Sequence, residues 1–367
     1  GEPDQRRDAP LARTRQQNLM TAPANGPVRS VCIVMLSAIG DAVHVLPVAN
    51  ALKRAWPDVE ITWIMQPSLR ALVEGHAAID ELIVFEGGRS GLRSWTNFAD
   101  LGHHVRGQHF DIALALQVYL KAGIIVGLLP AKIKLGFDTA RARDGNWIFT
   151  NERIAPQSPQ HVQAQYFEFL HHLGVDPEPV EWDIPIADED REAQASFFSK
   201  LDKPACSVVI ATSKPKKNWT AVGYARVLEE IESTHGLQPV LVGGPAKLER
   251  QMADEVLSLT KANPIDAIGD DLRRLIYILD GSALTVSPDT GPLHISRALE
   301  TPVVGIYGYT NPKRTGPYRR YYDLMVDGYA EFPGEEYPIS MDHRNGMKRV
   351  TVEMVLEKVD LAVRNYL

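Results

Sequence analysis

The most constraining feature of this sequence is an alternation between short apolar runs and longer amphipathic stretches, which occurs twice along the chain. It is typical of βαβ units, in which parallel strands are joined by helices. In the first half we expect strands at 30–36, 60–66, 81–86, 111–117 and 132–137, and helices at 42–55, 68–75, 97–106, 119–129 and 161–173. In the second half we expect strands at 206–212, 238–243, 265–268, 283–287 and 302–308, and helices at 220–235, 246–260, 271–280 and 291–299. The pattern predicts an α/β protein with two doubly wound, Rossmann-like domains.

A chain of 367 residues suits two domains better than a single core. Residues 174–188 carry three prolines and five acidic residues, a composition that favours an exposed connection. We predict a disordered extension at 1–27, an N-terminal domain at 28–175, a linker at 176–190, a C-terminal domain at 191–345 and a closing helix at 346–367 that packs back across the domains. Because open parallel sheets bind ligands beyond the carboxyl ends of their strands, we expect the site in a central cleft between the domains.

Composition excludes several classes of protein. The formal net charge of −7 and the pI near 5.9 argue against a main partner that is nucleic acid. Cys32 and Cys206 lie in separate apolar runs, which favours buried core residues over a disulfide or a metal pair. The longest apolar stretch, Ala122–Pro130, is far shorter than the roughly 20 residues that a membrane span needs. The first 29 residues also lack the apolar segment of a secretory signal, so we expect a cytoplasmic protein.

The loop after the first expected strand reads Ser37-Ala38-Ile39-Gly40-Asp41-Ala42-Val43-His44. Gly40 permits a tight turn from strand to helix, and Asp41 is a natural N-cap. Asp41 also follows the carboxyl end of a strand, where its carboxylate could take the proton of an attacking hydroxyl. The local sequence leaves both roles open, and they are compatible. The spacing Gly-x-Gly-x-x-Gly of a dinucleotide fingerprint is missing.

The strongest local signal is Pro288-Asp289-Thr290-Gly291-Pro292-Leu293-His294, which follows an expected strand and opens an expected helix. Pro292 fits an early helical position, which places Thr290 and Gly291 at the helix N-terminus. Free amides and the helix dipole favour an anion there, such as a diphosphate. Asp289 would repel a phosphate unless it caps amides or holds another group, such as a ribose hydroxyl. His294 can donate to a phosphate oxygen, although a lone helical histidine is more often structural.

A second candidate for phosphate binding is the loop at 211–220, which carries hydroxyls and three lysines ahead of an expected helix. We place Thr212, Ser213 and Lys217 in the site. For Lys214 and Lys216 we favour a solvated basic turn.

Three segments together resemble glycosyltransferase family 9, the heptosyltransferases of lipopolysaccharide core synthesis. They are Ser37–Pro47, Ala211–Trp219, and Ser287–His294 followed by Gly308–Pro312 and Thr315–Pro317. The resemblance extends from about residue 28 to 367 and implies a GT-B fold with an acceptor-binding N-terminal domain and a nucleotide-sugar-binding C-terminal domain. The Gly-Asp-x-x-His-x-Leu-Pro form of the first segment is most similar to heptosyltransferase I.

The resemblance also implies a role for each candidate residue. Asp41 is the general base, and Ser37, Gly40 and His44 lie on the acceptor side. The residues that bind the donor are Thr212, Ser213, Lys217, Asp289, Thr290, Gly291 and His294. To these we add Gly244 from the sequence itself, because Gly243-Gly244-Pro245 after an expected strand favours a turn that lets a nucleoside approach the backbone, with a plain turn as the alternative. The implied reaction is transfer of heptose from ADP-L-glycero-D-manno-heptose to the Kdo or inner-core region of lipopolysaccharide.

One cleft carboxylate without a nucleophile-and-base pair favours an inverting transfer, and no dense cluster of metal ligands is evident in the sequence. We therefore expect neither a metal nor a cofactor. In the first half, basic residues outnumber nearby acids: Arg89, Arg93, Arg106, Lys121, Lys132, Lys134, Arg141 and Arg143. They suit an anionic glycolipid acceptor and peripheral contact with a membrane, although scattered arginines are common on any surface.

The sequence departs from the family after the turn formed by Gly243 and Gly244. Family members often carry an acidic residue there, whereas this chain has Pro245-Ala246-Lys247. The resemblance therefore supports phosphate binding more strongly than adenine and ribose recognition. Two alternatives stay open: a family 9 transferase with a different nucleotide sugar or a non-lipopolysaccharide acceptor, and a non-catalytic protein that binds nucleotide sugars.

Overall fold

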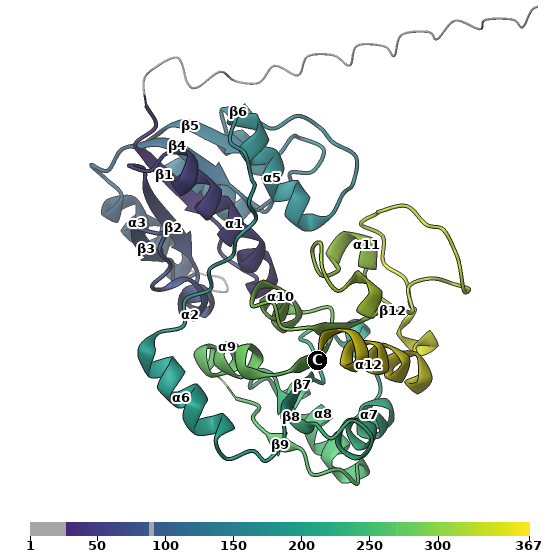
Figure 1. The fold of residues 1–367 in the computed structure, drawn as a ribbon. Helices are drawn as coiled ribbons and strands as arrows, with labels where there is room; N and C mark the ends of the chain where they lie inside the picture. The colour runs from purple at the N-terminus through teal and green to yellow at the C-terminus, as the bar shows by residue number, and fades with distance from the viewer. Residues whose placement is uncertain (1–26, 88–91, 270) are drawn as a thin grey trace, which may run out of the picture.

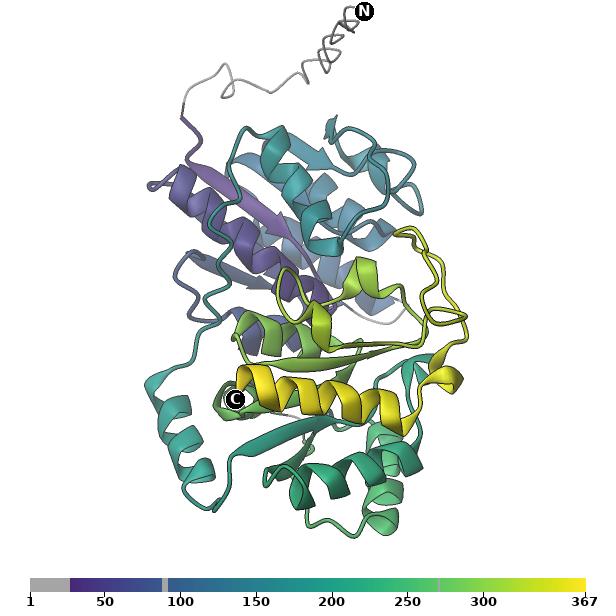
Figure 2. The same ribbon diagram turned by 45° about the vertical axis from the view of Figure 1, so that its right-hand side comes forward.

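The computed structural model describes residues 27–87, 92–269 and 271–367, which form two halves built around separate parallel sheets (Figures 1 and 2). The first sheet contains β1 (Ser30–Val34), β2 (Glu60–Met65), β3 (Glu81–Val84), β4 (Phe110–Ala115), β5 (Ala131–Gly136) and β6 (Glu152–Arg153). The second contains β7 (Ala205–Val209), β8 (Gln238–Val242), β9 (Ile265–Asp266), β10 (Leu284–Pro288), β11 (Val303–Tyr307) and β12 (Met325–Asp327). Their orders are β3-β2-β1-β4-β5-β6 and β12-β11-β10-β7-β8-β9. Both are the Rossmann order, which confirms the predicted fold class.

Helices connect the strands in both halves, as the alternation predicts. In the first half they are α1 (Ile39–Ala55), η1 (Pro67–Leu69), α2 (Arg70–Val73), α3 (Leu92–His104), α4 (Leu120–Leu128), η2 (Asn146–Phe149) and α5 (Val162–His172). In the second half they are α6 (Asp188–Phe198), η3 (Pro215–Lys217), α7 (Ala221–Ser233), α8 (Lys247–Leu259), α9 (Leu272–Gly281), α10 (Gly291–Ala298), α11 (Pro312–Thr315), η4 (Tyr322–Leu324), η5 (Met347–Arg349) and α12 (Val352–Tyr366). Among the described residues, no helix is long and apolar enough to cross a membrane.

The central strands form the cores of the two halves. Every residue of β7, β10 and β11 is buried, and β1 is buried from its second residue onward. Parallel strands covered by helices on both faces have this continuously apolar character. Cys32 in β1 and Cys206 in β7 are buried free thiols, as predicted, and burial raises the pKa of both.

The structure corrects the sequence prediction at several places. The short edge strands β6 and β12 were not predicted. Helix α6 begins at Asp188, inside the stretch predicted as linker, and the carboxylate of Asp190 accepts a hydrogen bond from the Ala187 amide at its start. The closing helix α12 packs on α7, β11 and β12 of the second half, whereas we expected it to pack across both domains. Of the predicted extension, residues 1–26 lie outside the described residues.

The two halves meet where the N-terminal turns of α1 and α10 touch (Figure 1). Both contact positions are glycines. A Cβ at Gly40 would lie 2.9 Å from Cδ2 of His294, and a Cβ at Gly291 would lie 2.9 Å from Cγ2 of Ile39. Any larger side chain would force the helices apart. A second contact links α2 to α9, where Arg273 donates to the Glu74 carbonyl at 3.2 Å.

Candidate active site

A cavity of about 510 Å³ lies between the halves, at the carboxyl ends of both sets of strands. We call it the larger cavity. The first half contributes the loop from Ser37 to Gly40, and the second half contributes the loops after β7, β8, β9 and β10. In the second sheet, the strands run outward from β7 to β9 on one side and from β10 to β12 on the other, so the strand order reverses between the neighbours β7 and β10. Open α/β sheets bind ligands at such a switch point. The larger cavity is therefore where this fold places a nucleotide.

The N-terminus of α10 lies on the wall of this cavity. Thr290 is its N-cap, Pro292 occupies the first turn, and no side chain caps the helix, which confirms the predicted helix start. The first turn of α1 lies on the same wall, because Ser37, Ala38, Ile39 and Gly40 line the cavity too. Two helix dipoles thus direct their positive ends toward one space, which suits a diphosphate.

A buried ionic cluster supports the start of α10 from behind. The Lys217 ammonium donates to the Asp289 carboxylate at 2.7 Å and to the Asp289 carbonyl at 3.0 Å. Thr310 donates to the same carboxylate, and Nε2 of His294 lies 3.6 Å from its other oxygen. Burial alone would raise the pKa of Asp289, but His294 and Lys217 hold it well below the usual range. The carboxylate that we expected to repel a phosphate is therefore neutralised by its neighbours and orients Lys217.

The predicted donor residues divide into two sets. Ser213, Gly244, Thr290 and Gly291 line the larger cavity, whereas Lys217, Asp289 and His294 form the cluster behind it. Thr212 belongs to neither. Its hydroxyl donates to the Lys214 carbonyl at 2.9 Å and accepts from the Lys214 amide at 3.1 Å, so it holds the shape of the loop.

Glu249 brings an acidic side chain to the turn formed by Gly243 and Gly244, although the sequence has no acidic residue directly after these glycines. Its carboxylate reaches back from the first turn of α8, accepts a hydrogen bond from the Gly244 amide and lines the larger cavity. Burial raises its pKa, and the hydrogen bond from Gly244 partly offsets that effect. We missed this residue because the helix returns it to the turn five positions later in the sequence.

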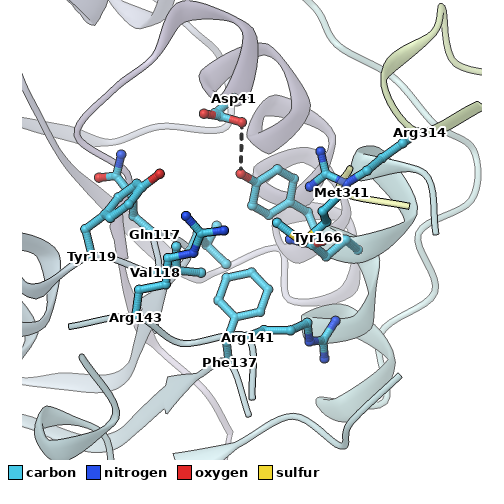
Figure 3. Close-up of a pocket in the computed structure, with 12 residues that line it drawn as sticks. Asp41, Gln117, Val118, Tyr119, Phe137, Arg141, Arg143, Tyr166, Arg314 and Met341 are labelled. Carbon is cyan, nitrogen blue, oxygen red and sulfur yellow. Dashed lines mark hydrogen bonds between the residues drawn. The ribbon is translucent and has the colours of Figure 1, made fainter. Parts of the chain in front are cut away.

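A second cavity, of about 150 Å³, lies beyond the carboxyl ends of β1 and β4, at the switch point of the first sheet (Figure 3). We call it the smaller cavity. Asp41 lies at its edge, half-buried, and one of its carboxylate oxygens accepts a hydrogen bond from the Tyr166 hydroxyl at 3.3 Å. Arg314 of α11 reaches in from the second half, and Arg143 from the segment before η2.

The environment of Asp41 favours a proton acceptor. Burial raises the pKa of its carboxyl, while the Ala38 amide, His294, Tyr166 and Arg314 act in the opposite direction. Asp41 is the third residue of α1 and Ala38 is the N-cap, so the predicted N-cap role of Asp41 is wrong. Its carboxylate instead accepts a long hydrogen bond, 3.5 Å, from the Ala38 amide. Burial also raises the pKa of Tyr166 well above 10, which keeps that hydroxyl protonated as a donor.

The first turn of α1 is a wall shared by the two cavities. Its residues from Ser37 to Gly40 face the larger cavity, and Asp41 faces the smaller one. A group bound at the helix N-termini and a group bound beside Asp41 would therefore meet at this turn.

His44 does not line either cavity, although we predicted it on the acceptor side. It is buried, and its Nδ1 pairs with Oε1 of Gln163 at 2.9 Å. Its ring centroid lies 4.6 Å from that of His294 across the contact between the halves. Burial lowers the pKa of His44 well below its usual value, so the ring is neutral. His44 is a packing residue of the interface.

Comparison with known proteins decides the family. The sequence profile of glycosyltransferase family 9 (heptosyltransferase) matches residues 98–341. The chain is 30% identical to the lipopolysaccharide core heptosyltransferase OpsX of Haemophilus influenzae over 338 residues, which cover 89% of this chain and 95% of that protein. The chain belongs to glycosyltransferase family 9.

Solved structures agree with the fold of this family 9 transferase. A family 9 glycosyltransferase from Veillonella parvula has a TM-score of 0.77 and 22% identity, covering 92% of this chain and 98% of the other. The Escherichia coli heptosyltransferase WaaC with ADP has a TM-score of 0.68 and 21% identity, covering 92% and 99%. The GT-B arrangement predicted from the sequence is thereby confirmed.

Sequence reasoning missed three residues around the candidate base of this transferase. Tyr166, Gln117 and Arg314 come from α5, from the end of β4 and from α11, and all line the smaller cavity. Gln117 donates to the Ser37 carbonyl and accepts from the Leu36 amide at 3.2 Å, which fixes the loop before Asp41. Only the position of Gln117 at the carboxyl end of an expected strand was a usable signal. Among the described residues, no three histidine, cysteine or acidic side chains are grouped as metal ligands would be.

Proposed function

We propose that this family 9 transferase moves heptose, with inversion and without a metal, from ADP-L-glycero-D-manno-heptose to the Kdo or inner-core region of lipopolysaccharide. The observation that carries the proposal is the shared wall: two helix N-termini face the larger cavity, and a carboxylate with a raised pKa faces the smaller one. The names of similar proteins support the choice of substrates. OpsX is a lipopolysaccharide core heptosyltransferase, and WaaC was solved with ADP and with ADP-2-deoxy-2-fluoro heptose.

In the proposed reaction, Asp41 accepts the proton of an acceptor hydroxyl held in the smaller cavity. The hydroxyl oxygen forms a bond to the anomeric carbon of the donor sugar. The bond between that carbon and the phosphate oxygen breaks, and ADP leaves with the electron pair. Attack from the side opposite the leaving group inverts the anomeric configuration. Tyr166 donates a hydrogen bond to the carboxylate and so holds it in place for the proton transfer.

The departing diphosphate gains negative charge, and the larger cavity is built to stabilise it. Backbone amides at the starts of α1 and α10 provide donors, and Lys217 is held beside α10 by Asp289. Glu249 lies at the Gly244 turn, where its carboxylate can accept hydrogen bonds from the ribose hydroxyls. These fixed groups supply the charge stabilisation that a divalent cation supplies elsewhere, and the proposal includes no cofactor.

We further propose that the first half contacts the cytoplasmic surface of the membrane that carries the acceptor. Leu120 and Leu128 of α4 and Ile148 of η2 are exposed, with Ile148 71% accessible, and α4 packs directly against η2. Lys121 and Lys134 lie on or beside α4. Apolar side chains bordered by lysines suit an anionic bilayer, and the smaller cavity opens beside them at Tyr119. Of the basic residues predicted to favour this contact, Arg89 and the side chain of Arg93 lie outside the described residues.

The test is release of ADP from ADP-heptose by the purified protein in the presence of a lipid A acceptor that carries Kdo, with the configuration of the product determined by NMR. We expect turnover and an inverted product. UDP-heptose and GDP-heptose serve as controls for the base, and acceptors without Kdo serve as controls for the sugar. Preference for another nucleotide would favour the first alternative, a family 9 transferase with a different donor. Tight ADP-heptose binding without turnover on any acceptor would favour the non-catalytic alternative.

A further inference from the structure

Two arginines beside Asp41 lack protein partners. Figure 3 shows Arg143 and Arg314 directing their guanidinium groups into the smaller cavity, from the two sides that flank Tyr166. In the part of the chain that the structure describes, neither guanidinium donates a hydrogen bond to a protein group or forms an ion pair. Arg314 is close enough to Asp41 and Tyr166 to act on the pKa of both, yet it forms no salt bridge with the Asp41 carboxylate.

Arg141 shows what a structural arginine at this site does instead. It lies two residues before Arg143 and also borders the smaller cavity, but its guanidinium points away from the cavity (Figure 3). It pairs with Asp138 and with Glu168, the latter at 2.7 Å, and it donates to the Ala155 carbonyl at 3.1 Å. The contact with Asp138 closes a turn within the segment after β5, and the contacts with Glu168 and Ala155 hold that segment against α5 and against the stretch after β6. The chain therefore supplies carboxylates where an arginine serves the fold, and no carboxylate of the described residues pairs with Arg143 or Arg314.

Two unpaired cations that face one cavity repel each other, and a bound anion removes that repulsion. A guanidinium group matches a carboxylate or a phosphate with two parallel hydrogen bonds, which makes arginine well suited to such an anion. The two groups come from opposite halves, so an anion between them would contact both halves at once. It would also lie next to Asp41, where the attacking hydroxyl must be.

We propose that Arg143 and Arg314 together bind an oxyanion, a carboxylate or a phosphate, that the acceptor sugar carries close to its nucleophilic hydroxyl. This inference rests on the proposed function only in taking the smaller cavity as the acceptor site. It assigns selection of an acidic acceptor to these two residues and not to the rest of the basic surface of the first half.

The experiment measures initial rates against acceptor concentration, at saturating ADP-heptose, for the wild type, Arg143→Gln and Arg314→Gln. Arg226→Gln, an exposed arginine on α7, is the matched control. We expect each cavity variant to raise KM for the acceptor about 10-fold or more, because a hydrogen bond to a charged group is lost, while Kd for ADP stays unchanged. Unchanged KM in both variants, with normal thermal stability, would overturn the proposal.

Modified acceptors identify the anion. One acceptor has its sugar carboxylate reduced to an alcohol, and another has its phosphates removed. The wild type should lose affinity for whichever acceptor lacks the recognised group, and the two variants should show no further loss on that acceptor. Variants that lose the same factor on every acceptor would contradict recognition of an anion. If the wild type transfers nothing from ADP-heptose, the proposed function fails, and calorimetric binding of the same acceptors to the same variants still decides this inference.

Discussion

The switch points of the two sheets have the same topology but opposite chemistry. In the second sheet, the charges behind the larger cavity are paired: Lys217 binds Asp289, whose carboxylate also accepts from Thr310. In the first sheet, the charges that point into the smaller cavity are largely unsatisfied: among the described residues, Asp41 accepts hydrogen bonds only from Tyr166 and, at 3.5 Å, from a backbone amide. One half is therefore preorganised to hold a ligand, and the other keeps groups free to react with one. This contrast is what the proposed division of the transfer reaction between the two domains requires.

The largest expected effect is on kcat and comes from a substitution in the first half. Asp41→Asn removes the proton acceptor and should lower kcat by about 10² to 10⁴-fold. Kd for ADP, measured by calorimetry, should change little, because Asp41 faces the smaller cavity. Lys217→Met is the matched variant of the other half and should weaken ADP binding. Retention of the wild-type rate by Asp41→Asn would end the assignment of the base.

Stability should change in opposite directions in the two halves. Asp289→Asn leaves Lys217 without its buried partner and should cost about 3 kcal/mol at pH 7. The depressed pKa of Asp289 stabilises the fold above the unfolded pKa of about 3.9, and that contribution disappears as the pH falls through the folded pKa. Asp41 has a raised pKa, so it destabilises the fold as the pH rises above the unfolded pKa of about 3.9, and the loss is complete above the folded pKa. Asp41→Asn should therefore raise Tm at pH 7. Thermal melts at pH 7 test both, and the same sign for both variants would refute the contrast.

A smaller effect concerns the contact between the halves. In Gly291→Ala, the new methyl group would lie 2.9 Å from Cγ2 and 3.0 Å from Cβ of Ile39. The overpacking should cost about 1–3 kcal/mol and separate the two cavities, which should lower kcat more than it weakens ADP binding. Gly102→Ala in α3 is the control, since its nearest neighbour would lie 3.7 Å away and alanine favours a helix. Equal kinetics for the two variants would mean that the contact between the helices does not control catalysis.

The smallest expected effect is a displacement of the pH profile. Because burial raises the pKa of Asp41, the acid limb of kcat/KM should lie above the ordinary aspartate value of about 3.9. The rate should fall as the pH drops through this raised pKa, since the base becomes protonated. His161, whose pKa burial lowers to about 4, stays neutral near pH 6.5 and should add no step there. A profile that extends from below about pH 3.9 to about pH 8 checks both points, and an acid limb at or below about 3.9 would contradict the burial effect.

The sequence was sufficient to predict most strands of the two sheets and most of the helices that connect them. Apolar periodicity identified ten of the twelve described strands, including β9 with its two residues. It missed the edge strands β6 and β12, of two and three residues, which leave almost no periodic signal. Pro292 correctly indicated the start of α10. The start of α1 was placed three residues too late, because Ala38 and Ile39 carry no capping signal and the first strong one is Asp41.

Contacts between distant segments could not be predicted from the sequence. Tyr166 lies 125 positions from Asp41, and Lys217 lies 72 positions from Asp289. Which of two nearby arginines is paired depends on Asp138, three positions before Arg141, and on Glu168, which only the folded chain brings to Arg141. The roles assigned to the site residues remain proposals that the variants above test.

The wall between the cavities has a consequence for inhibitors. A compound that imitates only the nucleotide would occupy the larger cavity, whose walls are partly backbone amides and glycines. Few mutations there could weaken binding of the compound without also weakening binding of the protein's own substrate. A compound that passes the first turn of α1 and places an acid group near Arg143 would engage both halves at once. Resistance to it would then require changes on two separate sheets.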